Sequence, residues 1–145
     1  MSEISFFFEE TKPIKLQKKV LKNTVDFLIQ NENKHAGEIT VVFCSDDYLL
    51  KINEQYLNHN YYTDIVTFDY VENSVISGDL FISVDRIIEN ASQLGVNFDE
   101  ELYRVIFHGI LHLCGFKDKT NAEKRLMREK EDFYLGKAGF RKEKK

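Results

Sequence analysis

The feature that most constrains the fold is an apolar segment between Asp99 and Cys114. At 3.6 residues per turn, its apolar side chains cover nearly every side of a helix. They are Leu102, Val105, Ile106, Phe107, Ile110, Leu111 and Leu113. A helix that is apolar all round is buried rather than laid on a surface. We therefore expect this helix at the centre of the molecule, with Gly115 ending it.

The remaining patterns predict a single domain over residues 1–145, without repeats or linkers. Strand patterns and helical patterns alternate along the chain. The expected strands are 4–10, 36–47, 63–71 and 78–84, and the expected further helices are 14–33, 48–57, 85–95 and 120–136. Because no helical pattern separates the third strand from the fourth, we expect an α+β fold with a mixed sheet of roughly four strands.

Two of these helices carry an apolar face that can be assigned. In the helix at 14–33 we expect an inward face made of Leu16, Val20, Val25, Leu28 and Ile29. In the helix at 120–136 we expect Ala122, Leu126 and Phe133 to turn inward and the mixed charges to form a solvated face.

Composition excludes some function classes. The net charge of −4 argues against binding of nucleic acid by bulk charge, although a local basic patch stays compatible with it. The first ten residues lack the pattern of a signal peptide, and no apolar run approaches the roughly 18 residues of a membrane-spanning helix. Cys44 and Cys114 are the only cysteines, which favours reduced thiols and a cytoplasmic protein.

The segment "HGILHLCGFKD", residues 108–118, predicts a metal site. Histidines four apart project from one face of a helix, so His108 and His112 can reach one cation. Gly115 can adopt a positive φ and turn the chain back, which brings Asp118 toward the same ion. Two nitrogens, one oxygen and an open position are typical of a catalytic zinc site. The alternative is a pair of structural histidines that hydrogen-bond only to protein neighbours.

These residues resemble the signature of the YbeY family of bacterial endoribonucleases, His-Gly-x-Leu-His-Leu-x-Gly-Tyr-Asp-His. The segment "INEQYLNHNYYTDIVTFDY", residues 52–70, is similar to the family's run from a Leu-Asn pair through Thr-Asp-Val-Leu-Ser-Phe. The segment "GDLFIS", residues 78–83, matches the family's following strand. The similarity extends from the second expected strand to the last helix.

The resemblance implies a zinc-dependent endoribonuclease of the cytoplasm that cuts single-stranded RNA. It implies a role in ribosomal RNA 3′-end maturation and ribosome quality control, with ribosomal RNA or ribosomal subunits as partners. His108 and His112 would be the first two ligands of one zinc ion per chain, and Asp118 stands where the family has a third histidine. A carboxylate oxygen is an acceptable zinc ligand, so the metal is expected to be retained.

One departure affects substrate binding. Leu57 follows Tyr56 at the position where the family has an arginine that contacts phosphate. His59, Lys117 and Lys119 are candidates to replace it. The loop "NHNYYTD", residues 58–64, and the tail "RKEKK", residues 141–145, are further candidate RNA contacts, because tyrosines stack on bases and cations neutralise phosphates. A packed connection and a solvated tail are the plain alternatives.

The catalytic group is expected to be a zinc-bound water, with the ribose 2′-hydroxyl as an alternative nucleophile. Asp64, beside Thr63 at a strand start, is a candidate to orient a ligand histidine, and turn chemistry is its alternative. Helical zinc peptidases have a glutamate where this chain has Gly109, so a peptidase would need a base such as Asp64 or Glu101 from elsewhere. A non-hydrolytic zinc protein that binds RNA or an assembly factor is the third hypothesis.

Overall fold

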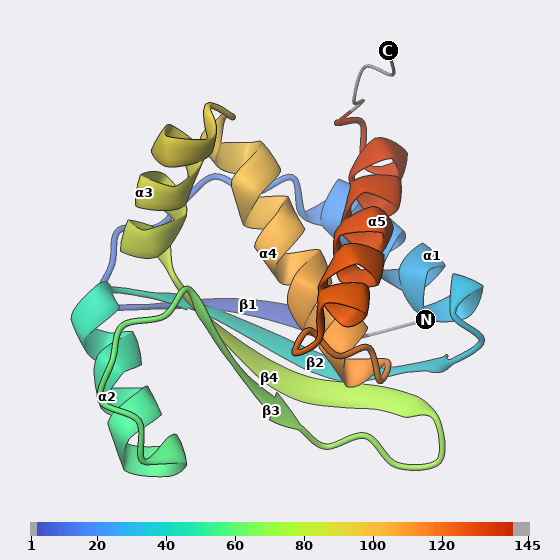
Figure 1. Cartoon of the computed structure of the whole chain (residues 1–145), viewed down its shortest axis with the longest axis horizontal. Helices are drawn as coiled ribbons and strands as arrows, with labels where there is room; N and C mark the ends of the chain where they lie inside the picture. The colour runs from blue at the N-terminus through green and yellow to red at the C-terminus, as the bar shows by residue number, and fades with distance from the viewer. Residues whose placement is uncertain (1–2, 141–145) are drawn as a thin grey trace.

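The computed structural model describes residues 3–140, and in it a four-stranded sheet packs against a layer of helices (Figure 1). The strands are β1 (Glu3–Glu9), β2 (His35–Cys44), β3 (Ile65–Asp69) and β4 (Val75–Ser83). The helices are α1 (Lys18–Asn31), α2 (Asp46–Leu57), α3 (Val84–Leu94), α4 (Phe98–Leu113) and α5 (Asn121–Lys137). The tail "RKEKK" lies outside the described residues.

The sheet has the strand order β1-β2-β4-β3. Strands β1, β2 and β4 are parallel, and β3 returns antiparallel to β4. The connection from β3 to β4 is a short turn, whereas each parallel pair is joined through at least one helix. The expected α+β fold with a mixed four-stranded sheet is confirmed.

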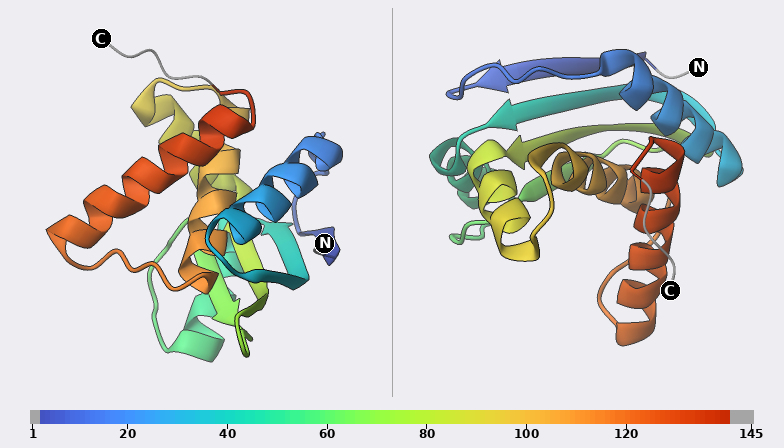
Figure 2. Two further views of the ribbon diagram at one scale, coloured as in Figure 1. Left: turned by 90° about the vertical axis from the view of Figure 1, so that its right-hand side faces the viewer. Right: turned by 90° about the horizontal axis from the view of Figure 1, so that it is seen from above.

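Helix α4 forms the centre of the molecule, as its composition predicts. Its seven expected core residues are all buried: Leu102, Val105, Ile106, Phe107, Ile110, Leu111 and Leu113. Its neighbours are β3 and β4 on one side and α1, α3 and α5 on the others (Figure 2). The smaller helix α2 packs against the other face of the sheet, in a separate cluster with Val66 and Phe81.

Gly109 explains how closely α4 approaches the sheet. A Cβ atom at this position would lie 2.8 Å from Cδ1 of Ile65 and 2.9 Å from Cδ2 of Leu80. A larger side chain there would have to displace the side chains of Ile65 and Leu80, through which α4 packs on β3 and β4. The residue after the first histidine therefore faces the core, and a glutamate at this position would point away from the metal site.

The predicted inward face is confirmed for α1 and wrong for α5. In α1 the prediction is confirmed, because Val25, Leu28 and Ile29 are buried and the two preceding apolar positions are partly buried. In α5 the predicted face was wrong, because Ala122, Leu126 and Phe133 are exposed. The buried residues of that helix are Met127, Glu131, Tyr134 and Leu135. This face includes an acid, Glu131, which is paired with Arg104 and His108 inside the protein, and a hydropathy pattern does not assign a charged residue to the core.

Both cysteines are buried and unbonded, as expected for reduced thiols. Burial raises the pKa of Cys44 and of Cys114 to about 12. Among residues 3–140, no helix has the length and apolar character needed to cross a membrane.

Candidate metal centre

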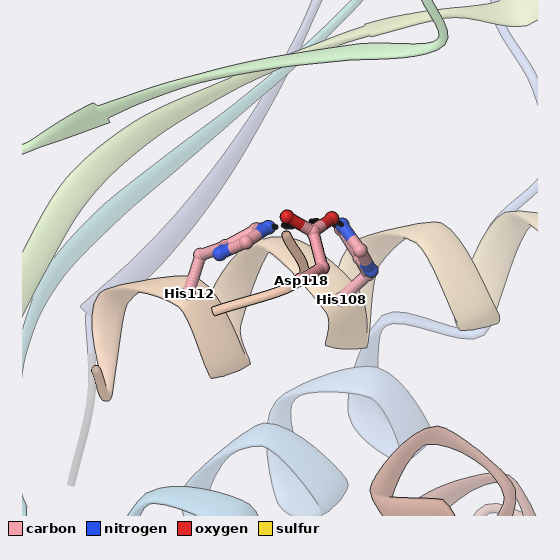
Figure 3. A group of neighbouring side chains, drawn as sticks. All are labelled: His108, His112 and Asp118. Carbon is pink, nitrogen blue, oxygen red and sulfur yellow. Dashed lines mark hydrogen bonds and ion pairs between the residues drawn. The ribbon is translucent and has the colours of Figure 1, made fainter. Parts of the chain in front are cut away.

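Three side chains converge beside the C-terminal half of α4 (Figure 3). The Nε2 atoms of His108 and His112 lie 3.0 Å apart. Oδ2 of Asp118 lies 3.4 Å from each of these nitrogens. Ligand atoms bound at about 2.0–2.2 Å to one tetrahedral zinc ion lie about 3.3–3.5 Å apart. The two distances to Asp118 match this range, and the distance between the histidine nitrogens is slightly shorter.

The hydrogen bonds made by the Nδ1 atoms of the two rings leave both Nε2 atoms facing each other and Asp118. Nδ1 of His108 donates to Oε2 of Glu131 at 2.6 Å, and Nδ1 of His112 donates to the carbonyl oxygen of Phe116 at 2.8 Å. In a neutral imidazole with Nδ1 protonated, Nε2 carries only a lone pair. The two lone pairs and the Asp118 carboxylate would repel one another, and a bound cation would satisfy all three. The donor set therefore fits a metal ion.

The turn after α4 positions two of these contacts. Gly115 has a φ of +106°, a conformation that suits glycine. The turn is closed by hydrogen bonds from Gly115 N to His112 O at 2.9 Å and from Phe116 N to Leu111 O at 3.0 Å. It directs the Phe116 carbonyl at the His112 ring and returns the chain so that Asp118 reaches the site, as the spacing predicted.

A capping box fixes the chain just beyond Asp118. Thr120 is the N-cap of α5, and its hydroxyl accepts a hydrogen bond from Glu123 N at 3.1 Å. The Glu123 carboxylate accepts from the backbone nitrogens of Lys119 and Thr120, each at 3.0 Å. Since these bonds hold the residues next to it, Asp118 has little freedom to leave the site.

Glu131 is the residue that the sequence patterns missed. Its side chain is 2% exposed and accepts from Arg104 at 2.9 Å as well as from His108. Burial raises the pKa of Glu131, but the His108 hydrogen bond and the positive charge of Arg104 outweigh it, so its pKa lies below the ordinary value. An ionised carboxylate here fixes the tautomer of His108 and increases the basicity of its Nε2.

Arg104 links Glu131 to a second buried acid. Its Nε atom donates to Glu101 Oε1 at 2.9 Å, and one of its terminal nitrogens also binds Glu101. Glu101 is 1% exposed and fully engaged, so it has no access to the site as a catalytic base. A signal for this network was present in the sequence. Positions 101, 104, 108 and 112 form one polar stripe along an otherwise apolar helix.

A cleft of about 670 Å³ opens beside the three candidate ligands, between α4 and the connection from α2 to β3. Among the predicted contacts, His59, Asp64 and Lys119 line this cleft together with Leu57. Lys117 is exposed and does not line this cleft. The cleft therefore brings part of the predicted loop "NHNYYTD" to the metal centre.

Two side chains of this cleft have defined surroundings. His59 stacks on Tyr61, and its Nδ1 lies 2.9 Å from the Tyr61 hydroxyl oxygen. Asp64 accepts a hydrogen bond from Asn90 at 3.4 Å, and burial raises its pKa above the ordinary value, with the positive charge of Arg104 offsetting part of that rise. Neither ligand histidine has its Nδ1 bonded to Asp64, because Glu131 and the Phe116 carbonyl occupy those positions.

The chain is similar to known proteins in sequence and in fold. The sequence model of the family described as Endoribonuclease YbeY matches residues 6–139. The chain belongs to the YbeY family. A relative named Endoribonuclease YbeY from Flavobacterium johnsoniae is 55% identical over 105 residues, which cover 72% of this chain and 76% of the relative. The relative of that name from Christiangramia forsetii is 48% identical over 126 residues, covering 87% and 88% of the two chains.

The fold agrees with a solved structure as well. The solution structure of TM1509 from Thermotoga maritima has a TM-score of 0.64 and 25% sequence identity, and the match covers 92% of this chain and 88% of that one. The resemblance of residues 108–118 to the YbeY signature thus reflects membership of the family over most of the chain.

Proposed function

We propose that this YbeY family member is a metal-dependent endoribonuclease, with zinc as its metal and single-stranded RNA as its substrate. One observation carries the proposal: three ligand atoms from His108, His112 and Asp118 lie within 4.8 Å of one another beside an open cleft. The names of the relatives supply the reaction class, because they are endoribonucleases.

The donor set favours zinc among the common metals. Two imidazoles and one carboxylate are typical of zinc in hydrolytic sites, whereas magnesium and calcium prefer oxygen ligands alone. When bound, zinc supplies Lewis acidity that polarises a phosphoryl oxygen and acidifies a coordinated water. The protein supplies the orientation: Glu131 holds the His108 ring and the Phe116 carbonyl holds the His112 ring.

The cleft residues supply the polar groups around a bound RNA strand. Asp64 offers a carboxylate beside the centre that can accept a proton from the attacking water or 2′-hydroxyl. Tyr61 offers an exposed ring on which an unpaired base can stack. His59 and Lys119 offer donors to phosphate oxygens. These roles favour a single strand, whose bases are free to enter the cleft.

We further propose that the substrate is ribosomal RNA and that the protein acts in its 3′-end maturation and in ribosome quality control in the cytoplasm. This finer role rests on membership of the YbeY family. It is tested by depleting the protein in its own cells and mapping the ends of ribosomal RNA. Accumulation of extended 3′ ends supports the role, and unchanged ends contradict it.

The reaction itself is tested with purified, zinc-loaded protein. We expect cleavage of single-stranded RNA that His112→Ala abolishes and that His35→Ala leaves intact. His35 is a matched control because it is an exposed histidine on β2, outside the candidate metal centre. Cleavage of casein would favour the peptidase hypothesis instead. Retained RNA binding without any cleavage would favour the non-hydrolytic hypothesis.

A further inference from the structure

A second cleft lies on the other side of the candidate metal centre, between α4 and α5. It has a volume of about 250 Å³, and its lining includes His108 and Asp118. The larger cleft beside the α2–β3 connection also includes these two residues. The two clefts therefore meet at the metal centre, which lies on the ridge between them.

The second cleft exposes cations although the chain as a whole is acidic, with a net charge of −4. Arg104, Lys124 and Arg128 line it together with the acids Asp118 and Glu131. Because Arg104 is paired with both Glu101 and Glu131, the positive charge open to the cleft is that of Lys124 and Arg128. A local positive field beside a metal centre attracts an anionic ligand such as phosphate.

Two of the three cations are available to a ligand. Arg104 is 15% exposed and already engaged by Glu101 and Glu131. Lys124 has no side-chain hydrogen bond or ion pair with any residue in the described range 3–140. Arg128 is 54% exposed, and its NH1 atom lies 3.8 Å from Oε1 of Glu131, which is a loose contact.

The geometry of α5 keeps these two cations together. Residues 124 and 128 are four apart on the helix, so their side chains leave the same face. Met127 and Glu131, which belong to the same side of α5, are buried against the rest of the protein. Two other cations of α5 are used elsewhere: Lys130 binds Glu32 at 2.9 Å, and Lys137 lies over Phe133.

We propose that Lys124 and Arg128 bind a backbone phosphate of the RNA strand, next to the phosphate that is cut at the metal centre. The strand would run from the larger cleft, across His108 and Asp118, into the α5 cleft. Lysine binds phosphate as a point charge and arginine as a planar fork, so the pair can hold one phosphate from two directions. The proposal rests on the proposed ribonuclease function, and it places a phosphate contact in a different cleft from the one that Leu57 lines.

The test measures binding of a fluorescently labelled single-stranded 2′-O-methyl oligouridylate to the zinc-loaded protein over a series of salt concentrations. This probe lacks the 2′-hydroxyl nucleophile and keeps every phosphate. For Lys124→Ala/Arg128→Ala we expect roughly tenfold weaker binding at low salt. The slope of log affinity against log salt should fall by about 0.7, since the pair contacts one phosphate and each phosphate contact to a single strand contributes about 0.7.

Arg125→Ala is the matched control. Arg125 is an exposed cation of the same helix and does not line the cleft, so its loss changes the net charge without removing the proposed contact. We expect its affinity and slope to stay near those of the unmodified protein. Because residues 124, 125 and 128 are all exposed, circular dichroism should confirm that each variant is folded.

Two results would overturn the proposal: an unchanged slope in the double variant, or an equal loss in Arg125→Ala. Failure of the ribonuclease function gives a different result, in which the unmodified protein binds the probe through Lys124 and Arg128 but leaves a cleavable RNA uncut. With a cleavable single strand, we expect the double variant to raise KM about tenfold and to leave kcat within about twofold, which is typical of lost uniform binding.

Discussion

Helix α5 takes part in two acid-centred networks, one around the buried Glu131 and one around the partly buried Glu32, and their comparison separates a functional charge from a structural one. At one network, Glu131 accepts from Arg104 and from His108, a candidate metal ligand. At the other, Glu32 binds Lys130 at 2.9 Å and accepts from the hydroxyl of Tyr134. Both acids are paired, but only the first has a partner that faces the open cleft. Burial and pairing alone therefore do not identify a functional carboxylate; contact with a candidate ligand does.

The largest change in stability is expected from a third kind of acid, one that is buried without any partner. Gly109→Glu would place a side chain against Ile65 and Leu80, and the added Cβ atom alone would lie within 3 Å of both side chains. Burial of an unpaired charge combined with overpacking should lower the free energy of unfolding by about 4 kcal/mol or more. Urea denaturation checks this. A variant of near-native stability would contradict the close packing of α4 on the sheet.

Removal of Glu131 should affect both stability and metal binding. Glu131→Ala leaves Arg104 with only Glu101, and loss of one partner from a buried ion pair costs about 3–5 kcal/mol. It also releases Nδ1 of His108, and loss of such an outer partner weakens metal affinity about 10–100-fold. Competition with a zinc chelator measures the affinity, and thermal unfolding measures the stability.

Glu131→Gln separates the two effects, because an amide oxygen can still accept the His108 hydrogen bond while the charge is lost. We expect its zinc affinity to lie between that of the unmodified protein and that of Glu131→Ala. If all three proteins held zinc equally well, Glu131 would have no role at the metal centre.

Glu32→Gln is the counterpart in the structural network. It should lower the free energy of unfolding by about 1–2 kcal/mol, because the charge-assisted bonds to Lys130 and Tyr134 weaken. Zinc affinity and RNA cleavage should not change, since neither cleft at the metal centre includes Glu32. A loss of zinc affinity in this variant would erase the distinction between the two networks.

The comparison also explains what the sequence could and could not predict. The apolar helix, the mixed sheet and the ligand geometry of His108, His112 and Asp118 follow from local spacing, which a single sequence records. Glu131 could not be assigned in that way, because its burial depends on Arg104, which lies 27 positions earlier in the chain on another helix. The same long-range pairing turned the buried face of α5 away from Leu126 and Phe133, which a hydropathy pattern favours.

Asp64→Asn is expected to change the free energy of unfolding least, and to raise it rather than lower it. Burial raises the pKa of Asp64 above its ordinary value of 3.8, and the hydrogen bond from its own backbone and the positive charge of Arg104 offset only part of that rise. A carboxyl whose pKa is raised by folding is protonated in both states at low pH and destabilises the fold as the pH rises through its folded pKa. Asp64→Asn should therefore stabilise the metal-free protein at pH 7, by less than about 1 kcal/mol, with no gain at pH 3.

The same substitution should lower RNA cleavage, because the amide cannot accept a proton. Thermal unfolding at the two pH values and a cleavage assay at pH 7 measure the two effects. A gain in stability together with a loss of activity is typical of a residue kept for function at a cost to the fold. Loss of the Glu131 charge should instead lower the free energy of unfolding at neutral pH. Its pairing holds the pKa of Glu131 below the ordinary value, so the ionised carboxylate supports the fold. If Asp64→Asn were destabilising at pH 7 and fully active, Asp64 would belong with Glu32 among the structural acids.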